Sequence, residues 1–215
     1  MARVRVRQHV NPLSNVFQVP VLPPDWSQIY KDLSKPLHLD IGCARGRFIL
    51  SMAQVEPAWN FLGLEIRHPL VEEANNIAAE KQLTNLYYFF CNANNSLKSL
   101  LESLPPAMLE RVTIQFPDPW FKNKHQKRRM VQPAMVEELA QFLVPGGELF
   151  LQSDVKEVAQ EMRERFAANP AFAFKHDPEI WLPENPLPVQ TEREIATIRK
   201  GQPVYRTLFV RVDKI

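Results

Sequence analysis

Cysteine, long apolar runs and glycine are all scarce in this sequence, which has six glycines among 215 residues. The two cysteines, Cys43 and Cys91, form no CxxC pair or other metal-ligand spacing, so we expect a reduced protein without a metal. No apolar stretch approaches the ~20 residues that a membrane span requires. The N-terminus also lacks the apolar core of a signal peptide. These absences favour a cytoplasmic protein with no membrane anchor.

An excess of one charge is lacking too, because 26 basic and 24 acidic residues leave a net charge of +2. Binding to nucleic acid would therefore require a local patch. Residues 122–129, KNKHQKRR, form such a patch, with five fixed positive charges and no acid. The alternating Arg3, Arg5 and Arg7 are a second candidate for RNA contact, and a basic tail without a partner is the plain alternative.

Short apolar segments alternate between the periods of strands and of helices. Prolines gather at 12–36, 105–106 and 178–188, which we interpret as extended loops. Predicted strands cover 37–41, 61–66, 86–91, 112–116, 148–152 and 204–212, and predicted helices cover 47–55 and 133–143 and begin at Pro69 and Asp154. The alternation predicts an α/β fold, a Rossmann-like, doubly wound and mostly parallel sheet of about seven strands with helices on both faces.

Acids close the first two predicted strands, where a parallel sheet binds its ligands. Asp40 precedes a loop with Gly42 and Gly46, whose lack of side chains lets a ligand approach the backbone. Arg47 takes the third position of a G-x-G-x-x-G fingerprint, which disfavours a nicotinamide dehydrogenase. Asp40 can instead face a cationic ligand such as the sulfonium end of S-adenosylmethionine. Glu65 can accept hydrogen bonds from both hydroxyls of a ribose. Taken alone, the Asp40 loop could be a plain strand-to-helix turn, and Glu65 could be a solvated glutamate at a strand end.

The residues that end the third and fourth predicted strands differ in how specifically they indicate a function. Asn92 can pair with an adenine edge, but asparagine is also a common turn residue. Asp118 stands between two prolines that restrict the backbone, and Trp120 and Phe121 follow with flat surfaces on which a base can stack. The basic segment 122–129 begins at once. This juxtaposition indicates RNA chemistry more specifically than any other part of the chain.

With these segments in view, the sequence resembles the bacterial tRNA (guanine-N7-)-methyltransferase family. The matching stretches are LDIGCARG, FLGLEIRHP, FPDPWFKNKHQKRR, LVPGGELFLQSD and TERE at 191–194, which together run from residue 37 to about 210. The FPDPW block is the specific one, whereas the first loop marks only an S-adenosylmethionine fold. The resemblance implies a class I methyltransferase fold, S-adenosyl-L-methionine as cofactor, tRNA as partner and 7-methylguanosine in the variable loop as product. It also implies one methyltransferase domain over 1–215, with a basic extension at 1–36 and a catalytic core at 37–215.

The resemblance implies roles for individual residues, with Asp118 as the catalytic one. The cofactor would be bound by Asp40, Gly42, Gly46, Glu65, Asn92 and Asp118. The target guanine would be bound by Lys122, Asp154, Thr191, Glu192, Arg193 and Glu194. The RNA would contact Lys124, His125, Gln126, Lys127, Arg128 and Arg129. Three residues depart from the family pattern: Ala44 replaces a glycine, Asn92 an aspartate and Arg193 an aromatic residue.

The chemistry needs no histidine, because guanine N7 carries a free lone pair and requires no general base. In agreement, the five histidines form no HxxxH or HExxH pattern. Asp154 fits a helix N-cap, with Glu157 at N3, as well as it fits a guanine ligand. Two other functions stay open: methyl transfer to another RNA, a small molecule or a protein, and an RNA-binding module of the same fold without activity. The sequence leaves monomer and homodimer equally open.

Overall fold

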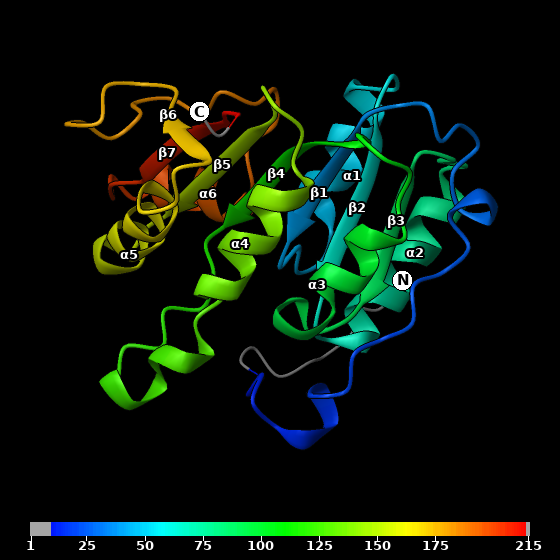
Figure 1. Ribbon diagram of the computed structural model, residues 1–215, viewed down its shortest axis with the longest axis horizontal. Coiled ribbons are helices and arrows are strands. Elements are labelled where there is room, and N and C mark those ends of the chain that lie inside the picture. Colours follow the sequence, from blue (N-terminus) through cyan, green and yellow to red (C-terminus); the bar gives the residue numbers. More distant parts are fainter. Residues whose placement is uncertain (1–9, 214–215) are drawn as a thin grey trace.

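The computed structural model describes residues 10–213, except for the side chains of Asn123 and Lys124. Arg3, Arg5 and Arg7, and the proposed RNA contact at Lys124, therefore lie outside this description. The described residues form one seven-stranded sheet in the order β3-β2-β1-β4-β5-β7-β6 (Figure 1). Its strands are β1 Leu37–Ile41, β2 Asn60–Glu65, β3 Leu86–Phe90, β4 Leu109–Gln115, β5 Glu148–Ser153, β6 Phe172–Phe174 and β7 Tyr205–Arg211.

Strands β1 to β5 pair in parallel, whereas β7 runs antiparallel to both β5 and β6. The helices are α1 Arg47–Val55, α2 His68–Glu80, α3 Ala93–Glu102, α4 Pro133–Phe142, α5 Lys156–Ala167 and α6 Glu192–Arg199. The apolar faces of α3, α4 and α5 share one core cluster, and those of α1 and α2 share another on the opposite side. The predicted fold class is confirmed.

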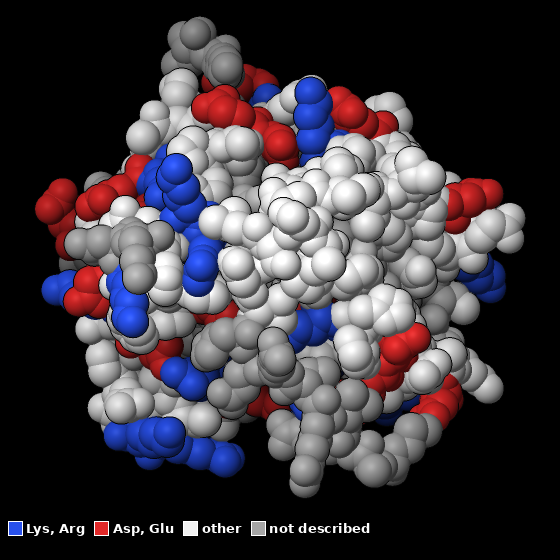
Figure 2. Space-filling model, turned by 90° about the horizontal axis from the view of Figure 1, so that it is seen from below, with Lys and Arg blue, Asp and Glu red and all other residues white. Residues whose placement is uncertain are grey.

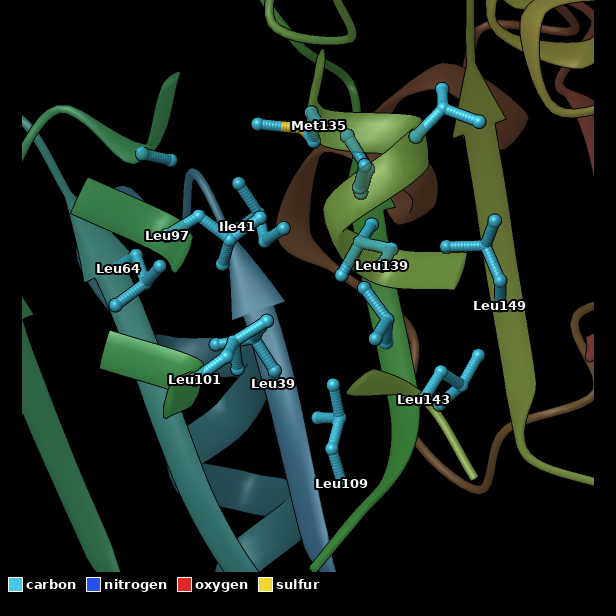
Figure 3. Packing of buried hydrophobic residues seen from close by; sticks show 14 of the residues in the cluster. Leu39, Ile41, Leu64, Leu97, Leu101, Leu109, Met135, Leu139, Leu143 and Leu149 are labelled. Atoms are coloured by element: carbon cyan, nitrogen blue, oxygen red, sulfur yellow. The ribbon is translucent and has the colours of Figure 1, made fainter. Parts of the chain in front are cut away.

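The larger core lies between the sheet and the helices α3 and α4 (Figure 3). Strand β1 shows why: Leu37, Leu39 and Ile41 alternate along one side of the strand and pack into this cluster. Between them, His38 and Asp40 point to the opposite face, and both are buried. The strand therefore carries apolar packing on one face and polar groups on the other.

Some elements were not predicted. The helix α3 was missed because its first residues, Asn94 and Asn95, are typical of turns. Asn92 caps this helix, since its Oδ1 accepts a hydrogen bond from the Asn94 amide at 3.2 Å. The short strand β6 and the helix α6 were missed as well. The predicted start of a helix at Asp154 is wrong, because α5 begins at Lys156 and has Val155 as its N-cap.

Candidate active site

A cleft of about 1530 Å³ opens at the carboxyl ends of the central strands. Sites for small molecules are typically 300–1,000 Å³, so this cleft has room for a second group beside a cofactor-sized ligand. Predicted site residues that line it are Asp40, Gly42, Glu65, Asn92, Asp118, Arg128, Asp154, Thr191, Glu192 and Arg193. Those that do not line it are Gly46, Lys122, His125, Gln126, Lys127, Arg129 and Glu194.

Asp118 is held in the cleft by an unusual backbone. Phe116 and Trp120, on either side of the Pro117–Pro119 segment, have φ angles of 48° and 43°. Bulky residues rarely adopt this left-handed region, and each such residue costs about 1–3 kcal/mol. Arg128 lies over the Trp120 ring, 5.0 Å from its centroid, so the basic segment folds back onto this loop. The loop therefore presents one carboxylate with little freedom to move.

Asp40 is a buried carboxylate in the floor of the cleft, 4% exposed. The Thr113 hydroxyl donates to its Oδ1 at 2.6 Å. Burial raises the pKa of Asp40 to about 6, and the Thr113 hydroxyl and the Gln115 amide oppose this rise. A buried carboxylate of this kind gains stability when a cationic group binds beside it.

Glu65 holds the loop that follows β1. The Ala44 amide donates to its Oε2 at 2.9 Å, and the Arg67 side chain donates to both carboxylate oxygens, at 2.8 and 2.9 Å. The hydrogen bonds that Arg67 donates to Glu65, together with the charges of Glu65 and Asp118, raise the pKa of Arg67. Arg67 is thus a cation in the cleft that interacts with two predicted site acids, Glu65 and Asp118. A diol that binds Glu65 has to replace hydrogen bonds that Arg67 donates to it.

The side chain of Asn92 forms hydrogen bonds with the N-terminal segment of the chain. Its Nδ2 donates to the carbonyl of Pro12 at 3.0 Å and to that of Phe17 at 3.2 Å. Asn95 also donates to Phe17 O, at 2.7 Å. Because Val10 and Pro12 line the cleft, these bonds fix a wall of the cleft. An aspartate at position 92 would lack the donor for both carbonyls.

The other side of the cleft is built by the start of α6. Thr191 is its N-cap and accepts from the Glu194 amide at 3.0 Å. Arg193 donates to Asp154, and Glu192 pairs with Arg47. The N-cap interpretation of Asp154 is therefore wrong, and its carboxylate faces a basic side chain in the cleft.

Glu194 is fully buried and turns away from the cleft. Its Oε1 accepts from Arg206 Nη2 at 2.8 Å, and its Oε2 accepts from Asn185 at 2.7 Å and from Gln152 at 3.1 Å. Gly46 also serves the core, because a Cβ there would lie 2.2 Å from the Tyr88 ring. Structural contacts thus account for both residues.

The comparisons with known proteins agree with this geometry. The family model described as "Putative methyltransferase" matches residues 34–207. The tRNA (guanine-N(7)-)-methyltransferase of Synechococcus elongatus is 65% identical over 211 residues, which cover 98% of this chain and 98% of that protein. The protein of the same name from Synechocystis sp. is 57% identical, with coverage of 98% and 99%. The chain belongs to the tRNA (guanine-N7-)-methyltransferase family.

Solved structures outside this family share the fold alone. The 16S rRNA methyltransferase KamB is 17% identical and covers 97% of both chains with a TM-score of 0.59. The precorrin-6y C5,15-methyltransferase of Geobacter metallireducens is 12% identical, covers 82% of this chain and 80% of its own, and has a TM-score of 0.52. The implied class I methyltransferase fold is confirmed.

In this family member, the basic segment is not uniformly available to RNA. Residues Asn123–Arg128 form the 3-10 helix η3, on which Gln126 and Lys127 are exposed. Arg129 instead pairs with Glu161 and donates from Nε to the Pro119 carbonyl at 3.0 Å. On the face at the bottom of Figure 1, Lys and Arg gather on one side, beside a broad area without charge (Figure 2).

Sequence reasoning missed several polar residues of this site, of which Arg67 and Gln115 line the cleft. The helix α6 was also missed, although Thr191 and Glu194 form the T-x-x-E pattern of a helix capping box, which could have predicted its start. Within residues 10–213, no helix is long and apolar enough to cross a membrane, and no three metal-ligating side chains gather at one point.

Proposed function

We propose that this protein transfers the methyl group of S-adenosylmethionine to N7 of a guanine in tRNA. One observation carries the proposal: Asp40 near the end of β1, Glu65 at the end of β2 and Asp118 after β4 line one cleft, and Arg128 of the basic segment lines it with them. Family membership supports the same reaction. The 7-methylguanosine of the variable loop is the expected product.

The residues at the donor end of the cleft fit S-adenosylmethionine. Asp40 supplies a buried negative charge for a cationic ligand, and Glu65 supplies acceptors for a ribose. Gly42 has a φ of 83° and Ala44 one of 52°, so the loop after β1 turns tightly, and both residues line the cleft. When bound, this cofactor supplies an electrophilic methyl group. Asn92 would act through the wall that it fixes.

The residues at the acceptor end position the base. Guanine N7 attacks with its own lone pair, so alignment is the main requirement, and alignment can contribute about 7–11 kcal/mol. Asp118 accepts hydrogen bonds from the N1–H and N2 amine of the guanine and stabilises the positive charge that the ring gains. Asp154 and the segment 191–193 hold the base from the opposite side. Lys127 and Arg128 contact the RNA, and Lys122, which was expected to hold the guanine but does not line the cleft, contacts the RNA as well.

We further propose that 37–215 is one catalytic domain, preceded by an extension at 1–36, and that the protein works in the cytoplasm. There it meets tRNA as substrate. Because the net charge is only +2, contacts with the phosphates of tRNA come from its exposed and cleft-lining basic residues.

Mass spectrometry of nucleosides tests the reaction. The protein is incubated with S-adenosylmethionine and, in separate reactions, with bulk tRNA, ribosomal RNA or small guanine acceptors. We expect 7-methylguanosine in tRNA alone, within the fragment that holds the variable loop. Methylation of another acceptor in preference to tRNA, or at another atom, would refute the proposal.

Two variants test the role of Asp118. Asp118→Asn should lower turnover by about a hundredfold or more while the protein stays folded, because one preorganised group is lost. Asp213→Asn is the matched control, since that carboxylate is 79% exposed and lies outside the cleft. Near-normal turnover in Asp118→Asn would exclude a catalytic role.

A further inference from the structure

A stripe of buried polar side chains crosses the sheet beneath the cleft. The pairing register places Asp40 beside Thr113, Gln115 beside Gln152, and Gln152 beside Arg206. Because paired residues of adjacent strands point to the same face, these side chains share one face of the sheet. They come from β1, β4, β5 and β7, so the stripe spans the sheet from the donor end of the cleft to the acceptor end.

Gln152 is the junction of this stripe. It is completely buried, and its Nε2 donates to Gln115 Oε1 at 2.7 Å and to Glu194 Oε2 at 3.1 Å. An amide nitrogen has two hydrogens, so one group can make both bonds. Gln152 therefore joins a residue that lines the cleft to a residue of α6.

On the donor side, Gln115 stands two residues after Thr113, which donates to Asp40. The Nε2 of Gln115 is buried and makes no hydrogen bond of standard geometry within the described part of the chain, but the Gln115 amide is close enough to Asp40 to lower the pKa of that carboxyl. The bond from Gln152 to Gln115 Oε1 fixes the amide plane and so the direction of this Nε2. Gln115 is thus held in the cleft by Gln152.

On the acceptor side, Glu194 anchors the first turn of α6. Arg206 and Asn185 also bind its carboxylate, and its amide binds Thr191. The residues just before Glu194, from 191 to 193, line the cleft. A shift of Glu194 would therefore move the wall against which the acceptor base is held.

We propose that Gln152 is a positioning residue for methyl transfer, because its amide nitrogen fixes the donor end of the cleft, through Gln115, relative to the acceptor wall, through Glu194. This inference rests on the proposed function. Gln152 touches neither the cofactor nor the base and is not a catalytic residue. Its role is to set the alignment of two groups that bind on different strands, and a misplacement of about 1 Å can cost a hundredfold in rate.

Gln152→Met tests the inference, because methionine has a similar length but no donor. We expect kcat with tRNA to fall about tenfold to a hundredfold at 25 °C. KM for tRNA and the Kd of S-adenosylhomocysteine should change by less than about threefold, since alignment is lost and ground-state binding is kept. Gln115→Leu should give a similar loss of kcat. The double variant should lose little more, because both substitutions break the same hydrogen bond between Gln152 and Gln115.

Thr207→Val is the matched control. Thr207 is buried beside Arg206 on β7, its hydroxyl has no hydrogen-bond partner among the described residues, and it points to the opposite face of the sheet. A merely structural effect would lower the melting temperature of Gln152→Met, which loses two hydrogen bonds, and leave its kcat near that of the wild type. Thr207→Val removes a hydroxyl that has no partner, so it should keep both the melting temperature and kcat near those of the wild type. Wild-type kcat in Gln152→Met, or an equal loss in Thr207→Val, would overturn the inference.

Hydrogen exchange gives a readout that does not depend on activity. The amides of Glu194 and Ile195, which bind Thr191, should exchange at least threefold faster in Gln152→Met than in Thr207→Val or the wild type. Unchanged exchange would also overturn the inference. If the wild-type protein makes no 7-methylguanosine, the proposed function fails, and the exchange rates still decide whether Gln152 holds α6.

Discussion

The guanidinium of Arg193 lies against the carboxylate of Asp154, with Nε donating to Oδ2 at 2.8 Å. The two residues are 39 positions apart, at the start of α6 and after the end of β5. Arg193 is 64% exposed, whereas Asp154 is 14% exposed. An exposed arginine therefore fixes one oxygen of a less exposed carboxylate that faces the proposed guanine position.

Arg193→Ala should raise KM for tRNA about threefold to tenfold, because Asp154 loses the group that orients it. An exposed ion pair contributes only about 0–1 kcal/mol, so the melting temperature should change little. Steady-state kinetics with tRNA and thermal melting check both expectations. Arg193→Lys keeps the charge but lacks the two-donor geometry, so its KM should be intermediate. An unchanged KM in Arg193→Ala would contradict this role.

Asp40 should make the protein less stable as the pH rises. Its pKa is about 6 when folded and near the ordinary 3.8 when unfolded, so between these values the folded state binds more protons. The stability that this proton confers is fully present below pH 3.8 and is lost as the pH rises through 6. The rise corresponds to about 3 kcal/mol. Asp40→Asn, which cannot ionise, should therefore melt several degrees above the wild type at pH 8.

A series of melts from pH 4 to pH 8 checks this expectation. The difference between Asp40→Asn and the wild type should shrink as the pH falls through 6 and be smallest near pH 4. The exposed Asp213→Asn serves as control for a charge change outside the cleft. At pH 8, Asp40→Asn should also bind S-adenosylmethionine more weakly. If Asp40→Asn gained the same stability over the wild type at every pH, burial would not raise the pKa of Asp40.

Local patterns in the sequence predicted the parts of the fold that local physics determines. The strand 37–41 and the helix 47–55 were predicted with their exact ends, because apolar spacing and the flanking Gly42 and Gly46 define them. The start of α5 was misplaced, since Asp154 has the composition of an N-cap but is drawn to Arg193 on a distant helix. A partner that is remote in sequence overrides the local signal.

The candidate site was predicted in the same uneven way. Acids at strand ends were read correctly as cleft residues, because a parallel sheet brings its carboxyl ends together. Asn92 lines the cleft as predicted, but its side chain also binds Pro12, and Glu194 does not line the cleft and binds Arg206. No rule of spacing reveals such contacts, since they depend on which loops the fold brings into reach.

Asn92→Asp should loosen the N-terminal wall of the cleft. Aspartate has no donor for the carbonyls of Pro12 and Phe17 and would set a negative charge against them, which costs about 1–3 kcal/mol locally. Limited proteolysis should cut between residues 11 and 18 several times faster than in the wild type. Asn76→Asp, on the exposed face of α2, is the matched control and should leave cleavage unchanged. Equal cleavage of all three proteins would exclude Asn92 as the anchor.

Lys127 and Arg129 should differ in what they contribute, although they stand two residues apart in one basic segment. Lys127 is exposed, whereas Arg129 is 14% exposed and pairs with Glu161 beside the Asp118 loop. Lys127→Ala should weaken tRNA binding and reduce the log–log salt slope by about 0.7, the value for one phosphate contact on a single strand. Its melting temperature should stay that of the wild type.

Arg129→Ala should do the opposite, because it leaves Glu161 with one basic partner fewer and frees the Pro119 carbonyl. We expect a lower melting temperature and lower turnover, since the loop that carries Asp118 loses a support, with the salt slope unchanged. Binding of tRNA at 50–200 mM salt, measured for both variants with melting curves, separates the two residues. A reduced slope in Arg129→Ala would mean that its ion pair opens when RNA binds and that Arg129 contacts phosphate after all.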